Sequence, residues 1–208
     1  MMSSFEFAPR TALLIEHASV VKELLEILGI PTRRVSKGSE FMKECRRWTE
    51  WLEKQARSRV PDSWKSELNY FGDASAGIDL WPQSEWQYGT DARDDVITIR
   101  VWLPDPFNPA PIYVALLTGP ISSWPLCEQF NEAYRNRLDE SILADFPGEP
   151  DDGKPLWAEL DWEDAPQDTD AFAARVTEKI GRLFSTRELV TATLRDVLGA
   201  GGKKKRTP

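Results

Sequence analysis

The sequence predicts an α+β fold: two N-terminal helices, a roughly four-stranded antiparallel meander, and then a helix, a strand and two further helices packed on the sheet. Three observations predict it. Apolar residues recur at intervals of three and four in the first 60 residues, the interval changes to two after Trp64, and helical spacing returns after Pro125. The 208 residues, 41% of them hydrophobic, suffice for a single domain at 1–200, with a helical part (1–60) and a sheet-containing part (61–200).

The first 60 residues hold two predicted helices. The first spans residues 11–28, because apolar side chains repeat there at helical spacing and Gly29 with Pro31 ends the run. The second spans residues 39–57, with Trp48 on its apolar side and acid–base pairs along its wet side.

Four strands are expected between Trp64 and Leu117, where apolar and polar side chains alternate and Gly, Pro and Asp fill the connections. The last one, 112–117, is apolar on both faces and is expected to be central. Aromatic side chains beside an Arg and two acids suit either a protein-binding face or a second core layer, and the sequence leaves both open. The face that alternation turns away from the helices carries Glu67, Asn69, Phe71, Asp79, Trp81, Thr98, Arg100, Trp102 and Tyr113.

The C-terminal part is expected to start with a helix at 125–143, followed by a short strand at 156–160 and a further helix. A capping box at Ser185 then begins the last helix, and Gly199 stops it. Residues 201–208 include four consecutive basic residues and are expected to form a disordered basic tail.

No run of residues is apolar enough for a secretory signal or a membrane span. The longest uncharged window, 106–127, contains five prolines and cannot be a spanning helix. Two dispersed cysteines, Cys45 and Cys127, are interpreted as reduced, buried thiols. These features predict a cytoplasmic protein without a membrane partner.

Charge is distributed unevenly along a chain whose net charge is −8. Segment 32–60 has nine basic and four acidic residues, whereas segment 139–170 has twelve acidic residues and one basic residue, Lys154. Such asymmetry indicates either two surfaces with different partners or charges that face water and neutralise one another.

Catalytic motifs are weak throughout. Residues 148–154 match the phosphate-loop spacing G-x-x-x-x-G-K, but Pro155 stands where a Mg²⁺-binding Ser or Thr belongs, and the acids of the loop would repel phosphate. His17 is the single histidine, and together with two dispersed cysteines it lacks the paired spacing of a zinc site. No cofactor and no metal are expected.

One enzymatic alternative remains. The order helix, meander, helix, strand, helix is compatible with the topology of PD-(D/E)xK nucleases, whose strand acids hold Mg²⁺ beside a lysine. Asp79 would supply the first acid and Glu67 a substitute for the second, but the third strand offers Arg100 without the required acid. A degenerate, inactive relative therefore fits as well as an active nuclease.

The leading expectation is a non-enzymatic accessory or regulatory protein that binds another macromolecule. A basic protein is the expected partner, and an immunity or counter-defence factor is the concrete form. The overall acidity of the chain argues against nucleic acid as the partner. The expected binding residues are Asp151, Asp152, Glu163, Asp164, Trp81, Trp102 and Arg100.

Overall fold

The structure is a computed structural model that describes residues 4–31, 40–71, 75–82, 84–89, 96–105, 107, 111–118, 124–151, 153–161 and 165–203. Its elements follow in the order α1 (Pro9–Glu16), α2 (Ala18–Ile27), α4 (Glu40–Arg57), β1 (Trp64–Phe71), β2 (Ser75–Pro82), β3 (Thr98–Leu103), β4 (Ile112–Leu117), α5 (Cys127–Arg135), α6 (Glu140–Asp145), β5 (Leu156–Leu160), α7 (Thr169–Ser185) and α8 (Arg187–Lys203).

The strands form one antiparallel meander in the order β1-β2-β3-β4-β5, so each strand pairs with its neighbours in the chain. The α+β class expected from the sequence is confirmed, with one more strand in the meander. The added strand is the one expected at 156–160, β5, which joins the meander by pairing with the edge of β4 that β3 leaves free. β4 therefore has partners on both edges, in agreement with its apolar side chains on both faces.

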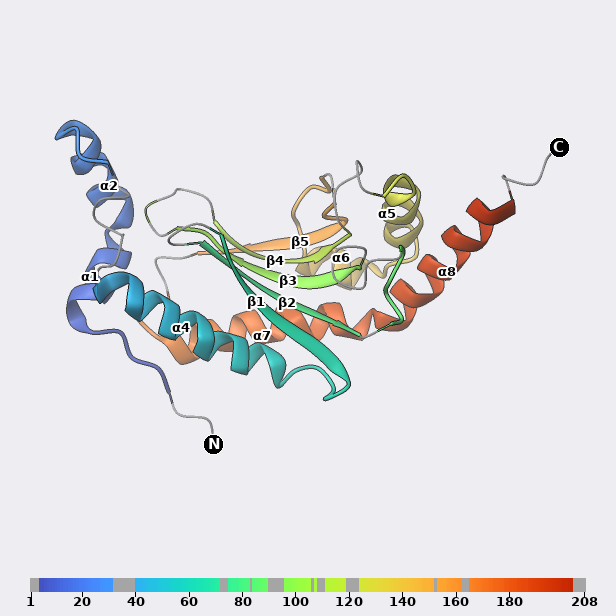
Figure 1. Cartoon of the computed structure of the whole chain (residues 1–208), viewed down its shortest axis with the longest axis horizontal. Helices are drawn as coiled ribbons and strands as arrows, with labels where there is room; N and C mark the ends of the chain where they lie inside the picture. The colour runs from blue at the N-terminus through green and yellow to red at the C-terminus, as the bar shows by residue number, and fades with distance from the viewer. Residues whose placement is uncertain are drawn as a thin grey trace.

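One face of the sheet, here called the inner face, packs on helices. α4 lies against β1 and β2, and α7 lies beside α4 against β3 and β4 (Figure 1). Alternation turns Ile78, Val101 and Val114 toward these helices, and all three are fully buried. Trp48 of α4 meets Phe172 of α7 with ring centroids 5.7 Å apart, so both helices share one core with the sheet.

The first described residues are held against α4. Phe7 packs on Trp48 with ring centroids 5.6 Å apart, and Phe5 meets Phe7 edge-on at 5.1 Å. The backbone N–H of Ala8 donates a hydrogen bond of 2.7 Å to the buried carboxylate of Glu44. These contacts fix the start of α1 on the body of the molecule.

Two expected helices are divided in the structure. The helix expected at 11–28 is interrupted at His17, whose φ of −116° and ψ of 24° depart from helical values, so α1 and α2 are separate. The helix expected at 125–143 becomes α5 and α6, which are separated by a turn over residues 136–139. Apolar spacing continues across both breaks, which is why sequence periodicity does not reveal them.

The last helix is longer than expected. α8 continues through Gly199 to Lys203, because a glycine inside a helix costs only about 1 kcal/mol and does not by itself end it. Ser185 is the last residue of α7 and does not begin α8. The expected tail at 201–208 therefore begins with three helical residues, and residues 204–208 lie outside the described residues.

α2 projects from the body of the molecule at the end opposite to α8 (Figure 1). Ala18 is its one buried residue, whereas Leu24, Ile27 and Leu28 at its distal end are exposed, Ile27 to 73%. Among the residues that the structure describes, no helix combines the length and the apolar character needed to cross a membrane.

Candidate functional site

The face of the sheet that turns away from α4 and α7, here called the outer face, carries two rows of side chains that cross all five strands. The strand register sets both rows, because residues paired across antiparallel strands point to the same side. The first row consists of Glu67, Asp79, Arg100, Ala115 and Trp157. The second row consists of Asn69, Gly77, Trp102, Tyr113 and Glu159.

The end of the outer face where β2 ends and β3 begins is covered. Trp81 and Thr98 lie there, and both are buried. α5 lies on the side of the sheet opposite to α7 (Figure 1), and the hydroxyl of Thr118, just after β4, donates a hydrogen bond of 3.2 Å to Asn131 of α5. Both interpretations of the outer face therefore apply, each to its own part: a second core layer at this end, and an accessible surface over the two rows.

Asp79 and Arg100 form a bidentate ion pair in the first row. Arg100 Nε and Nη2 donate hydrogen bonds of 2.6 and 2.8 Å to the two carboxylate oxygens, and Asn69 Nδ2 adds a third of 3.2 Å. The side chain of Asp79 is only 5% exposed and that of Arg100 is 23% exposed. Burial acts to lower the pKa of Arg100, but the hydrogen bond and the charge of Asp79 outweigh it and raise this pKa. The guanidinium is thus held charged and oriented at the centre of the face.

Aromatic rings form a line across the outer face, here called the aromatic line. Phe71 meets Trp102 with ring centroids 5.1 Å apart, and Trp102 stacks on Tyr113 at 6.3 Å. Tyr113 then meets Trp157 edge-on at 6.2 Å. Gly77 leaves room for the line, because a Cβ at this position would lie 3.2 Å from the Phe71 ring. Phe71 is 44% exposed and the other three rings are half-buried, so the line remains accessible to a partner.

The loop between α6 and β5 folds over the Trp157 end of the aromatic line. Gly148 packs so closely on the indole that a Cβ would lie 2.3 Å from it. Lys154 places its Nζ 4.8 Å from the ring centroid of Tyr113 and 4.9 Å from that of Trp157. The same ammonium lies 2.6 Å from Asp151 Oδ2, so one cation is held by two rings and a carboxylate.

The residues considered for a nuclease, Glu67, Asp79 and Arg100, lie together in the first row. Both carboxylate oxygens of Asp79 are already engaged by Arg100, whereas a metal-dependent nuclease needs them for the ion. In the described part of the chain, no group of three or more His, Cys, Asp or Glu side chains is placed to hold a metal ion. This geometry gives the nuclease alternative no support.

The expected binding residues are found in different places. Trp102 and Arg100 lie on the accessible part of the outer face, whereas Trp81 lies in its covered part and is out of reach of a partner. Asp151 lies in the α6–β5 loop beside the two rows. The other three expected residues, Asp152, Glu163 and Asp164, lie outside the described residues.

Part of the charge in the acidic segment 139–170 is used inside the fold. Asp145 forms a 2.5 Å ion pair with Arg182 of α7. Asp168 caps α7 by accepting a hydrogen bond of 2.9 Å from the backbone N–H of Ala171. The segment therefore presents less negative charge to a partner than its composition suggests.

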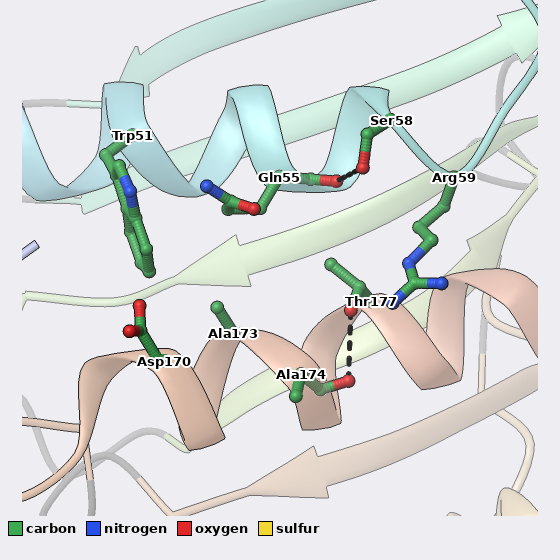
Figure 2. A pocket seen from close by; sticks show the side chains of 8 residues that line it. All are labelled: Trp51, Gln55, Ser58, Arg59, Asp170, Ala173, Ala174 and Thr177. Atoms are coloured by element: carbon green, nitrogen blue, oxygen red, sulfur yellow. Dashed lines mark hydrogen bonds between the residues drawn. The ribbon is translucent and has the colours of Figure 1, made fainter. Parts of the chain in front are cut away.

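A second concave feature lies between α4 and α7, on the surface that these helices turn away from the sheet. It is an open groove of about 380 Å³, and Figure 2 shows Trp51 and Asp170 at one end and Arg59 at the other. Ser58 and Thr177, which line the groove toward its Arg59 end, donate their hydroxyl protons to the backbone carbonyls of Gln55 and Ala174. We assign no activity to this groove, because its polar groups do not converge on one point.

Sequence reasoning missed Trp157, Glu159 and Lys154 as parts of the outer face. Alternation in the expected strand does place Trp157 and Glu159 on one side, but only the pairing of β5 with β4 shows that this is the side of the aromatic line. No sequence signal indicates that Lys154 lies between two rings, because the contact depends on how the loop folds back.

The fold and the site define a class: an α+β protein whose antiparallel sheet is packed on helices on one face and presents aromatic and charged side chains on part of the other. Comparison with protein-family models, with curated proteins and with solved structures found no match.

Proposed function

We propose that this protein is a non-enzymatic accessory or regulatory protein that binds a partner protein on the accessible part of its outer face. The observation that carries the proposal is the aromatic line from Phe71 to Trp157 around the Asp79–Arg100 pair. Tyr, Trp and Arg side chains contribute most of the binding free energy in protein interfaces. An immunity or counter-defence factor that neutralises its partner is the concrete form of this proposal.

The surface is suited to binding because it is preorganised. The rings pack on one another, and four hydrogen bonds from Arg100, Asn69 and Thr98 fix the Asp79 carboxylate. Few side chains would therefore lose rotamer freedom when a partner docks. The sheet beneath them is held by a continuous core, which keeps the rows in register. A partner would therefore meet a rigid surface at a low entropic cost.

A basic partner fits the charges of this surface best. The two cations beside the aromatic line, Arg100 and Lys154, are each already paired with a carboxylate of the same chain. Glu159, at the β5 edge of the second row, is an exposed carboxylate. Complementary charge speeds association and suppresses wrong partners more than it adds affinity.

Site-specific photo-crosslinking tests the proposal. Phe71 and Tyr70 are adjacent, are exposed to 44% and 41%, and point to opposite faces of β1, so they form a matched pair. We expect benzoylphenylalanine at position 71 to crosslink a protein in extracts of the native cells, and the same group at position 70 not to crosslink it. Trp102→Ala, shown to be folded by its thermal melting, should abolish the crosslink. A crosslink that forms equally from both positions and survives Trp102→Ala would contradict the proposal.

The acidic residues have a kinetic test once the partner is isolated. Replacement of Asp151, Asp152, Glu163 and Asp164 by Asn or Gln should slow association several-fold at low salt and flatten its salt dependence, because surface charges steer encounters over roughly 8–10 Å at moderate salt. The matched controls, Lys43→Gln and Arg47→Gln on α4, remove exposed charges on the other side of the molecule and should not slow association. An unchanged rate in the acidic variant would mean that the segment is solvated surface.

Incubation with DNA and RNA in the presence of Mg²⁺ or Mn²⁺ separates this proposal from the nuclease alternative. We expect no cleavage, because Arg100 occupies both oxygens of Asp79. Cleavage that is lost in Asp79→Ala would overturn the proposal in favour of a nuclease.

A further inference from the structure

We propose that the space between Tyr113 and Trp157, here called the Tyr113–Trp157 notch, is a receptor site for a lysine side chain of the partner, and that Lys154 of this chain occupies it in the free protein. The inference rests on the proposed function, because the notch lies at one end of the aromatic line. It adds the chemical group that the surface recognises, a primary ammonium, and a contact that covers the site until a partner binds.

The notch is built for one cation. Two aromatic rings face the Lys154 ammonium at 4.8 and 4.9 Å, within the range of a cation–π contact, and the edge-on arrangement of the rings at 73° leaves a corner between them. Asp151 supplies a carboxylate oxygen at 2.6 Å. Rings on two sides and a carboxylate on the third are the environment in which a desolvated ammonium is stabilised.

A second carboxylate stands beside the notch. Glu159 is directly opposite Tyr113 across the β4–β5 pair and lies on the same face of β5 as Trp157, two residues away. It is exposed and forms no ion pair with the described residues. Asp151 and Glu159 both lie near this end of the aromatic line, so removal of the Lys154 charge would leave two carboxylates there without that cation.

Lys154 is held in place by the shape of its loop. Gly153 has a φ of +83°, a conformation that favours glycine, and the backbones of Asp151 and Lys154 are hydrogen-bonded to each other. Thr118, at the end of β4, donates its backbone N–H to the Gly153 carbonyl at 2.8 Å. These contacts fix the backbone of the turn, whereas the Lys154 side chain is retained only by the notch, so it can leave without unfolding the turn.

Lys154 covers the Tyr113–Trp157 notch in the free protein because it competes successfully with free cations for this site. A tethered ammonium has a local concentration in the millimolar range or above, so a free cation at low concentration cannot displace it. A partner docked on the rest of the aromatic line holds its own lysine close to the notch, so the ammonium of that lysine also has a high local concentration. Exchange of one ammonium for another then keeps the two rings and Asp151 in contact with a cation.

Vacating the notch by mutation tests the inference without the partner. The probe is n-butylammonium chloride, which has the length and charge of a lysine side chain, and the readout is the NMR signal of the Trp157 indole N–H, which donates to the Glu149 carbonyl at 2.6 Å. Lys154→Ala should show a saturable shift in the millimolar range, at least about tenfold tighter than in the wild-type protein. n-Butanol, at the same concentration and ionic strength, should produce no saturable shift.

Two control variants establish that the probe binds in the vacated notch itself. Lys154→Met keeps a side chain of similar length in the notch without charge and should not bind the probe. Tyr113→Leu added to Lys154→Ala removes the other ring of the notch, keeps the Trp157 indole signal and should abolish binding. Lys154→Ser is the second vacated variant if Lys154→Ala does not give a folded spectrum. Absence of a saturable shift in a folded vacated variant, or an equal response to n-butanol, would overturn the inference. Neither result would affect the crosslinking from position 71, so failure here is distinguishable from failure of the proposed function.

Discussion

The Asp79–Arg100 pair is a buried ion pair on a face that a partner can otherwise reach. A buried pair is stable only while both members are present, because either charge left alone has lost its water without a replacement. At this position the pair also separates the covered part of the outer face, at Trp81, from the accessible rings at Trp102. The main consequence of the pair is a fixed orientation of the Arg100 guanidinium, because β2 holds Asp79 and β3 holds Arg100.

Loss of one member of the pair should destabilise the protein. We expect Arg100→Met to lower the free energy of unfolding by about 3 kcal/mol, because Asp79 would remain buried without its counter-charge. The double variant Asp79→Val with Arg100→Met should recover more than half of this loss, and urea unfolding of all three proteins measures both numbers. Equal destabilisation in the single and double variants would mean that side-chain packing, and not charge, dominates.

Burial changes the chemistry of Cys45. Burial, followed by the charges of Glu44 and Asp105, raises the pKa of its thiol to about 12 from the 9.0 of an exposed cysteine. Because the pKa is higher in the folded state, the contribution of this thiol to stability is fully present below about pH 9 and is lost as the pH rises toward 12.

The same pKa predicts slow modification of Cys45. Only the thiolate reacts with iodoacetamide, so a raised pKa should slow alkylation at pH 8 by about a thousandfold relative to the denatured chain. Mass spectrometry of timed samples with and without denaturant measures the ratio. Native alkylation of Cys45 at the denatured rate would show that the helix exposes this side chain.

Among the elements, β4 connects the two sides of the sheet. It pairs with β3 and with β5, its inner side chains meet α7, and its outer side chains include Tyr113 of the aromatic line. A substitution in β4 is therefore expected to perturb both the core and the candidate site. α2 is the opposite case, because its distal apolar side chains contact little of the molecule.

Val114→Asp should prevent stable folding. Val114 is fully buried on the inner side of β4, and an isolated carboxylate there costs several kcal/mol against a total stability of about 5–15 kcal/mol. Leu24→Asp on α2 is the matched control, because Leu24 is 54% exposed and its replacement should leave the melting temperature nearly unchanged. Thermal melting by circular dichroism compares the two. Equal midpoints for wild type and Val114→Asp would be incompatible with the position of β4 in the core.

For the whole molecule, the two ends of the chain should differ in their effect on stability. Removal of residues 1–7 deletes Phe5 and Phe7, which pack on the aromatic core of α4, and should lower the melting temperature by roughly 5–10 °C. Removal of residues 204–208 deletes no apolar side chain and should not change it. A large effect of the C-terminal deletion, measured in the same melting experiment, would show that these residues dock on the fold.

The sequence by itself determined the class of the fold and the two faces of the sheet, because both follow from local periodicity. An interval of two assigns side chains such as Asp79 and Trp102 to one side of their strands whatever the neighbouring strand is. Tertiary structure decided which part of that face is open, since the burial of Trp81 depends on contacts between segments distant in the chain. Tertiary structure also decided that Lys154 lies between Tyr113 and Trp157. The two rings come together only when β5 pairs with β4, and Lys154 reaches them only through the conformation of the α6–β5 loop.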